Sequence, residues 1–265
     1  MSWYVFFTIF ACILPQIPIF SRIFMVEKTS GIVLRSIKYV DNSLIVDMLT
    51  DEGTRRSFIA RVSNSKRAKM RPYLFQPLSI LEVEYDSRVK GGLYRIQGAT
   101  VNMPYSSIPF DASKLALALF LAEFLYHATR DEQENEPLYL YLEQSLRWLD
   151  GVEGPCPNFH LVLMMRLTRF VGFFPNTEGY RVGAYFDLLD GTYRTSPPMH
   201  PHVLPSDEAA KINTLMRLNF ETMHLFKMTR AERARCLEVI LQYYRLHVPG
   251  FPELKSLDVL KETFS

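Results

Sequence analysis

Acidic residues are missing from one stretch near the start of this 265-residue chain, because no Asp or Glu stands between Glu52 and Glu82. The same stretch carries Arg55 and Arg56, followed by five cations within residues 61–71 (RVSNSKRAKMR). An undiluted basic segment on a small β-domain is typical of proteins that bind a polyanion, most often nucleic acid. A solvated, lysine-rich hairpin is the alternative interpretation.

Cysteine is scarce as well. The three cysteines, Cys12, Cys156 and Cys236, are far apart, and no CxxC pair exists. A four-thiolate zinc site is thereby excluded and a disulfide framework is not expected, which fits a reducing cytoplasm. We therefore expect no metal, no cofactor and a cytoplasmic location.

Motifs of the common enzyme classes are also missing. The chain has no phosphate-cradling glycine loop, no GxSxG and no HExxH. His200 and His202 flank Pro201 without cysteine or carboxylate ligands beside them, so we interpret them as loop residues. Cys156 and His160 are close in sequence, which is weak evidence for a catalytic pair. We expect the protein not to be an enzyme.

The first 24 residues differ from the rest. The apolar run WYVFFTIFACIL is shorter than the roughly 20 residues that a membrane-spanning helix needs, and no Lys or Arg precedes it. Directly afterwards, Met25 opens a segment typical of a β-domain. We expect translation to begin at Met25 and residues 1–24 to be an upstream extension; an export signal or membrane anchor is the alternative.

Alternating apolar residues predict five short strands between Thr29 and Val101. These are GIVLRSIKY (31–39), LIVDMLT (44–50), TRRSFIARV (54–62), SILEVEYD (79–86) and LYRIQGATV (93–101). Phe58 and Tyr85 occupy apolar positions of this alternation, which predicts that both point into the interior. Five strands joined by short polar turns favour a closed oligonucleotide-binding (OB) barrel over residues 25–105, with an SH3-like barrel left open.

Helical spacing replaces the strand period after residue 106. Helices are expected over 113–130, 137–150, 158–172, 207–220 and 229–247. Thr229 and Glu232 have the spacing of a capping box at the start of the last one. An irregular insert at about 178–205 includes a hairpin turning at Asp190–Gly191. The predicted fold is therefore α+β: an N-terminal five-stranded OB-type β-barrel followed by an α-helical domain (106–265) with a small hairpin insert.

Several stretches, in order, resemble one family. They are GIVLRSIKYVDNSLIVDMLTDEG, SFIARV, LFQPLSILEVEYD, YRIQGA, LALFLAEFLYHATRDEQENEPLYLYLEQSLRWLD, NFHLVLMMRLTRFVGFFPN and ERARCLEVILQYYRLHVPGFPELKSLDVLKE. From about Lys28 to its end the chain resembles RecO, the bacterial recombination mediators, in their Bacteroidetes form. Many RecO proteins carry a four-cysteine zinc module, but residues 178–204 contain no cysteine. We expect Tyr185, Phe186 and Tyr193 to stabilise the insert by packing instead.

The resemblance implies a DNA repair and recombination mediator of the RecF pathway. Such proteins bind single- and double-stranded DNA, anneal complementary strands and bind the C-terminal tail of the single-stranded DNA-binding protein SSB. They also act with RecR to load RecA onto SSB-coated strands. The expected location is the cytoplasm, in association with the nucleoid.

Annealing brings two polyanions together, so cations must neutralise phosphates on both strands. The candidate DNA-binding residues are Arg55, Arg56, Arg61, Lys66, Arg67, Lys69 and Arg71, then Arg35 and Lys38, and finally Lys90 and Arg95. Tyr73 and Phe75 follow the basic segment and are candidates for base stacking. By family analogy, Arg166 and Arg169 are candidates for the SSB tail.

Two other functions fit the sequence. One is a non-catalytic adaptor between proteins, whose basic loop docks an acidic partner. The other is a membrane-attached protein, which requires residues 1–24 to be a genuine anchor. Salt-dependent binding to a single-stranded oligonucleotide separates the mediator from the adaptor.

Overall fold

The N-terminal part of the protein is a closed five-stranded barrel. The structure, a computed structural model, describes residues 26–88, 92–129 and 133–263. The strands are β1 (Val26–Lys38), β2 (Ser43–Thr50), β3 (Arg55–Arg61), β4 (Ile80–Asp86) and β5 (Leu93–Met103). They follow the order β1-β2-β3-β5-β4, and β4 pairs with β1 to close the barrel. All five predicted strands, and with them the barrel, are confirmed.

The barrel interior follows the alternation of the sequence. Phe58 and Tyr85 are both buried, as predicted, and their rings meet edge to face with centroids 5.3 Å apart. A short 3-10 helix, η1 (Pro72–Phe75), adds Leu74 and Phe75 to the same apolar core. Because η1 lies between β3 and β4, it links the end of the basic loop to the barrel interior.

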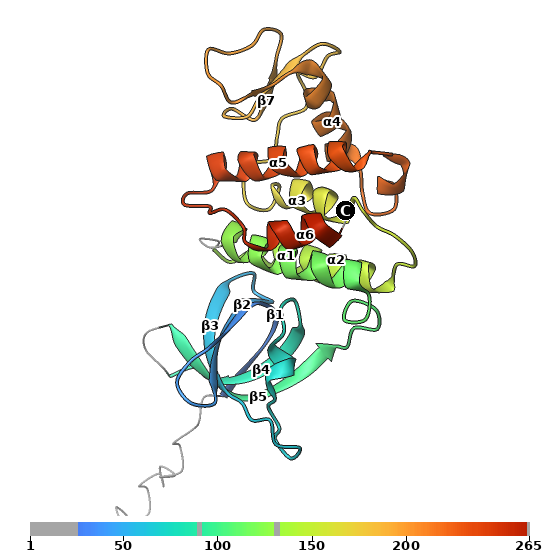
Figure 1. The fold of residues 1–265 in the computed structure, drawn as a ribbon. Helices are drawn as coiled ribbons and strands as arrows, with labels where there is room; N and C mark the ends of the chain where they lie inside the picture. The colour runs from blue at the N-terminus through green and yellow to red at the C-terminus, as the bar shows by residue number, and fades with distance from the viewer. Residues whose placement is uncertain (1–25, 89–91, 130–132, 264–265) are drawn as a thin grey trace, which may run out of the picture.

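The C-terminal part is helical. Its helices are α1 (Ala112–Ala128), α2 (Glu136–Gly151), α3 (Phe159–Leu167), α4 (Ser206–Arg217), η2 (Met223–Leu225), α5 (Arg230–His247) and α6 (Ser256–Thr263). Figure 1 shows α1 and α2 directly against the barrel, α3, α5 and α6 beyond them, and the insert at the far end. None of the helices in the described ranges is long and apolar enough to cross a membrane.

Most helix predictions are confirmed, with three differences, of which the first is that the fourth helix, predicted to reach Phe220, ends at Arg217. The capping box at α5 is present: the Thr229 hydroxyl accepts from the Glu232 N–H, and the Glu232 carboxylate accepts from the Thr229 N–H. The third helix was predicted to reach Gly172 but ends at Leu167, because Arg169 N–H bonds to the Arg166 carbonyl and tightens the chain into a turn. The short α6 was not predicted.

The barrel and the helical part share an apolar core. Ile32, Leu34 and Leu49 from the barrel belong to the same buried cluster as the α1 side chains. Polar contacts reinforce the junction: the Tyr139 hydroxyl donates to Ser30 Oγ at 3.0 Å, and the Tyr105 hydroxyl donates to the Leu78 carbonyl at 2.6 Å. The barrel is therefore fixed to the helices at one end and free at the other.

The insert is a three-stranded sheet of order β7-β6-β8, with β6 (Tyr185–Asp187), β7 (Thr192–Arg194) and β8 (Val203–Leu204). The hairpin predicted at residues 190–191 is confirmed. Phe186 and Tyr193 are buried, and the Tyr193 hydroxyl donates to the Ala209 carbonyl, whereas Tyr185 is only partly buried.

Within the described residues no three His, Cys, Asp or Glu side chains gather into a metal site. Residues 1–24, interpreted above as an extension, lie outside the described ranges.

Candidate nucleic-acid interface

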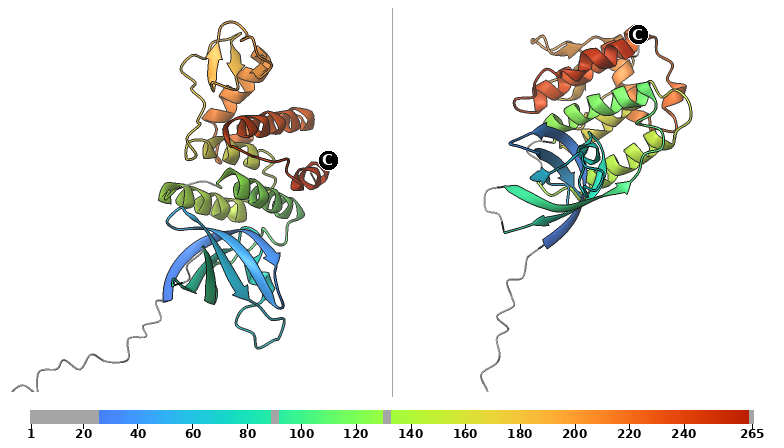
Figure 2. Two further views of the ribbon diagram at one scale, coloured as in Figure 1. Left: turned by 90° about the vertical axis from the view of Figure 1, so that its left-hand side faces the viewer. Right: turned by 60° about the horizontal axis from the view of Figure 1, so that its bottom comes forward.

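The basic loop (residues 61–71) projects from the barrel end that lies away from the helices (Figures 1 and 2). Its backbone is held by hydrogen bonds, from Ser63 N–H to the Met70 carbonyl at 3.1 Å and from Ala68 N–H to the Ser65 carbonyl at 3.0 Å. The Arg71 guanidinium donates to the Lys66 carbonyl at 2.5 Å. These contacts order the loop without using its other cations.

Four cations of the basic loop face solvent. The side chains of Arg61, Lys66, Arg67 and Lys69 are exposed. Among the residues that the structure describes, none of the four forms an ion pair with an acid. Uncompensated like charges in one loop repel one another and create a positive potential, which an approaching polyanion lowers. The arrangement is suited to binding phosphates.

Arg55 and Arg56 occupy different surroundings. The Arg55 guanidinium donates to the Tyr126 carbonyl at 2.9 Å, and it lies 4.7 Å from the centre of the Tyr126 ring. Arg56 binds the Glu52 carboxylate at 2.5 Å and the Tyr85 hydroxyl at 2.6 Å. Both arginines are half-buried and already paired, so DNA would have to displace existing contacts. The structure separates them from the four solvent-facing cations of the loop.

The remaining candidate cations also differ. Arg35 is paired with Asp47 at 3.0 Å, and its guanidinium lies 4.2 Å from the centre of the Tyr126 ring. Lys38 and Arg95 are exposed and have no ion pair among the described residues. Lys90 lies outside the described ranges. Arg35 therefore joins the group of structural arginines, while Lys38 and Arg95 extend the exposed positive surface over the barrel.

The two candidates for base stacking, Tyr73 and Phe75, both lie in η1 but point in different directions. The Tyr73 side chain is 58% exposed and remains available for a base. Phe75 is 1% exposed and packs in the barrel core, so the interpretation of Phe75 as a stacking residue is wrong. Because η1 is a tight 3-10 turn that buries Leu74 and Phe75, only the side chain before them points outward.

The Tyr85 hydroxyl holds a charged network at the barrel wall. It donates to the Glu27 carboxylate at 2.7 Å and accepts from the Arg56 guanidinium. Burial and the hydrogen bond to Glu27 raise the pKa of Tyr85 to about 12, so the hydroxyl stays protonated at neutral pH. This network gives Arg56 a structural role.

Arg166 lies in the last turn of α3, and Arg169 lies two residues beyond its end. Arg166 is partly buried and donates through Nε to the Leu218 carbonyl at 2.8 Å. Arg169 is exposed and its guanidinium lies 4.2 Å from the centre of the Phe174 ring. Partly buried aromatic rings, including Tyr141 stacked on Phe170 with centroids 4.9 Å apart, pack in the same helical core.

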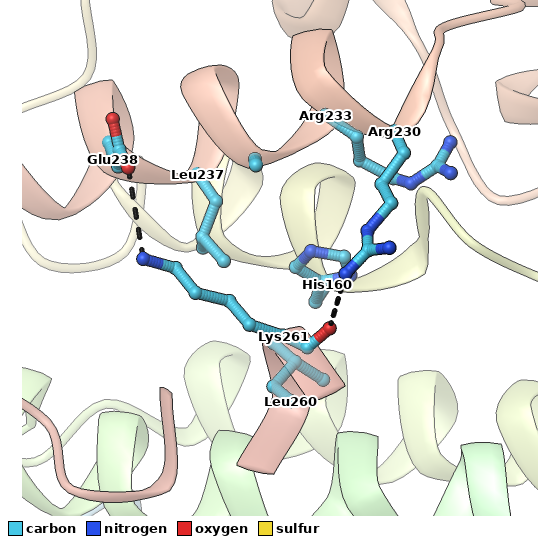
Figure 3. A pocket seen from close by; sticks show the side chains of 8 residues that line it. His160, Arg230, Arg233, Leu237, Glu238, Leu260 and Lys261 are labelled. Atoms are coloured by element: carbon cyan, nitrogen blue, oxygen red, sulfur yellow. Dashed lines mark hydrogen bonds and ion pairs between the residues drawn. The ribbon is translucent and has the colours of Figure 1, made fainter. Parts of the chain in front are cut away.

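A cavity of about 230 Å³ between α5 and α6 was not expected from the sequence (Figure 3). Leu237 and Leu260 form its apolar wall, and Arg230, Arg233 and Lys261 bring positive charge to it. His160 also lines it, and burial, followed by the charge of Arg233, lowers the pKa of that imidazole to about 3. The spacing of Arg230 and Arg233, one helical turn apart, is the sequence signal that could have indicated a shared face.

Lys261 is the cation of this cavity whose partners are best defined. Its ammonium lies 3.7 Å from the Glu238 carboxylate, and its backbone carbonyl accepts from Arg230 at 3.3 Å. These contacts join α6 to α5, as the dashed lines in Figure 3 show. The cavity thus combines an apolar wall with a cationic rim.

Two family models match the chain. "Recombination protein O N terminal" matches residues 25–105, and "Recombination protein O C terminal" matches residues 109–258. The chain belongs to the RecO family. It is 52% identical over 241 residues to the DNA repair protein RecO of Phocaeicola vulgatus and to that of Bacteroides fragilis, covering 91% of this chain and 100% of each relative. It is also 35% identical to the DNA repair protein RecO of Flavobacterium psychrophilum, covering 90% of this chain and 99% of the relative.

The resemblance inferred from the sequence is confirmed by these matches. The boundary between the two family models, at residues 105 and 109, falls between β5 and α1. RecO membership and the OB-type barrel give the chain a role in DNA repair and recombination. The family does not by itself assign DNA contacts to individual residues.

Proposed function

We propose that this protein is a recombination mediator that binds single- and double-stranded DNA, anneals complementary strands and helps to load RecA onto SSB-coated DNA with RecR. It acts without bond chemistry, in the cytoplasm and on nucleoid DNA. The observation that carries the proposal is the set of four exposed cations at the free end of the barrel, Arg61, Lys66, Arg67 and Lys69, which form no ion pair with any acid in the described ranges. By neutralising phosphates, they lower the repulsion between two strands held on one surface.

Annealing of two complementary fluorescent strands, with and without SSB, tests the proposal. The full-length protein is expected to accelerate annealing in both conditions. A variant with Lys66→Glu, Arg67→Glu and Lys69→Glu is expected to lose the acceleration, because the surface then repels phosphates. Normal annealing by this variant would instead favour the adaptor between proteins, in which the same loop docks an acidic partner.

The SSB tail is proposed to bind at Arg166 and Arg169. The tail is acidic and ends in phenylalanine, and exposed Arg169 lies next to aromatic surface. The cavity of Figure 3 offers a similar combination of charges and apolar wall, so Arg233 provides the matched comparison. Titration of a labelled tail peptide into Arg169→Glu and Arg233→Glu variants separates the sites. The proposal requires that Arg169→Glu weakens binding and that Arg233→Glu does not.

A further inference from the structure

One edge of β1 loses its partner part-way along the strand. On this side, residues 26–32 pair with β4, and Val33 ends the ladder: its N–H donates to the Ser79 carbonyl at 2.9 Å, and its carbonyl accepts from the Leu78 N–H at 2.7 Å. Pro77, the residue before Leu78, has no N–H to donate, and Leu78 takes a positive φ of 63° that turns the chain away from β1. The ladder therefore stops while β1 itself continues.

A bulge sets which backbone groups of β1 face the open side. The register between β1 and β2 shifts just after Val33. Beyond this bulge the Tyr39 N–H donates to the Ser43 carbonyl at 2.9 Å, so Tyr39 and every second residue before it direct their backbone groups toward β2. The N–H and C=O groups of Ser36 and Lys38 therefore point to the open side, and no other group in the described ranges bonds to them.

A cavity of about 500 Å³ lies beside this open edge, between the barrel and the helical part. Leu34 and Ser36 of β1 and Pro77 line one wall, and Leu119 and Ala122 of α1 line the other. Figure 1 shows α1 directly above β1. Leu119 is 41% exposed, so α1 leaves an apolar side chain uncovered at this groove.

Charge does not explain this groove. Two cations and two acids line it, Arg35 and Lys255 against Glu123 and Glu253. Arg35 is bound to Asp47 at 3.0 Å, and Glu123 accepts from the backbone N–H groups at the start of α6. A polyanion would gain little here, whereas unbonded N–H and C=O groups beside an apolar wall suit a polypeptide backbone.

We propose that this groove binds an extended segment of a partner protein, which adds to the open edge of β1 as an antiparallel strand. The segment exchanges backbone hydrogen bonds with Ser36 and Lys38, and its side chains on one face pack against Leu119. Strand addition of this kind takes affinity from the backbone and specificity from alternate side chains. The partner segment is therefore expected to carry β-branched or aromatic residues at alternate positions, and no proline where its N–H groups face β1.

The edge suits a single extended chain and not a second barrel. It is short, it carries exposed Lys38 and it follows a bulge, and each of these features hinders pairing between two whole sheets. The helix α1 also stands over the groove, so an approaching element has to be thin. The inference does not depend on the proposed DNA function, because the basic loop lies at the other end of the barrel.

The test begins with random linear peptides, displayed on phage and selected against the full-length protein. We expect the selected peptides to share apolar residues at alternate positions. A selected peptide, labelled with fluorescein, is then made in two N-methylated forms, each of which blocks the N–H groups on one edge of the extended chain. Methylation of the edge that faces β1 should abolish binding and methylation of the other edge should not, because an added strand uses only one set of its N–H groups.

Proline substitutions in β1 provide a matched pair. Ser36→Pro removes an N–H that has no partner in the described part of the protein, so this variant should melt near the temperature of the unaltered protein and bind the peptide about tenfold more weakly. Ile37→Pro removes an N–H that faces β2, where Ile37 pairs with Ile45, so this variant should melt at a much lower temperature. The contrast tests the direction of each backbone group.

The apolar wall is tested separately. Leu119→Gln should weaken peptide binding about fivefold, since it removes apolar surface that the segment covers. Leu140→Gln is the control, because Leu140 is 43% exposed on α2 and does not line the groove. Neither a single-stranded oligonucleotide nor higher salt should displace the peptide, since its contacts are uncharged.

The proposal is overturned if the selection yields no peptide, or if the selected peptides bind the Ser36→Pro variant as well as the unaltered protein. Displacement of the peptide by the oligonucleotide would assign the groove to nucleic acid and overturn it too. Analytical ultracentrifugation covers the remaining occupant: a dimer that Ser36→Pro abolishes would assign the edge to a second copy of this chain in place of a partner segment.

Discussion

The salt dependence of DNA binding gives the strongest test of the basic loop. Each phosphate contact to a single strand contributes about 0.7 to the slope of log affinity against log salt. Four contacts from Arg61, Lys66, Arg67 and Lys69 give a slope of about −2.8, which corresponds to an affinity loss of about 50-fold between about 50 and 200 mM salt. The perturbation is the neutral variant Lys66→Gln, Arg67→Gln, Lys69→Gln.

This variant keeps one of the four contacts, so its slope should fall to about −0.7 and its affinity should change only about threefold over the same range. At about 0.15 M salt its affinity should be about 50-fold below that of the unaltered protein. Fluorescence anisotropy with a labelled oligonucleotide, repeated at several salt concentrations, measures both quantities. The fold is expected to be intact because the three side chains are exposed and make no ion pairs among the described residues.

A control removes the same net charge elsewhere. Arg217, Lys227 and Arg245 are exposed in the helical part, and their replacement by Gln also lowers the net charge of +2 by three. If binding depends on local phosphate contacts, this control keeps the full slope. Equal losses in the two triple variants would refute the reasoning, since they would show that net charge and not the loop determines affinity.

Three further predictions concern single residues. Phe75→Ala should lower the free energy of unfolding by about 3–5 kcal/mol, the usual cost of truncating a buried aromatic side chain, which urea titration measures. Tyr73→Ala should leave the free energy of unfolding unchanged and weaken single-strand binding, which fluorescence anisotropy measures. Gly53→Ala should lower the stability of the fold strongly, because φ is +76° and a Cβ would lie 2.1 Å from the backbone of the α2 N-cap. Gly92→Ala, with φ +77° but open space around the Cβ, should lower the free energy of unfolding by only about 1–2 kcal/mol. At Asp150, burial, which alone raises the pKa, is outweighed by backbone hydrogen bonds that lower it from 3.8 to about 2. Discounted for solvent screening at this partly exposed carboxylate, about 1 kcal/mol of stability present above pH 4 should be lost as pH falls through 2. Asp150→Asn should remove that dependence in acid titrations.

The barrel could be predicted because its signals are local. Alternation in TRRSFIARV decides which side of β3 is buried, and Thr229 and Glu232 mark the start of α5 through neighbouring residues alone. The early end of α3 could not be predicted from the sequence in the same way. Its apolar pattern continues to Gly172, and only the turn hydrogen bonds after Leu167 stop the helix.

Phe75 shows where periodicity fails. It follows Pro72 in a segment with neither strand nor helix period, so nothing in the sequence indicates which of Tyr73, Leu74 and Phe75 points inward. The 3-10 turn decides it by directing two adjacent side chains into the barrel. The cavity between α5 and α6 was missed for a similar reason, since it depends on a short helix that the sequence did not predict.

The arginines divide into two groups by position, which no charge count reveals. The guanidinium groups of Arg35 in β1 and Arg55 in β3 both lie over the ring of Tyr126 in α1, about 70 or more positions away in sequence. Together these two contacts fix the barrel to the helices. At the opposite end the basic loop has no acid of its own between Glu52 and Glu82. At the barrel end that faces the helices, Tyr126 contacts the arginines. At the end that carries the basic loop, no acid among the described residues compensates the exposed cations. That asymmetry is the physical reason to interpret the paired arginines as structural and to propose phosphate binding at the loop.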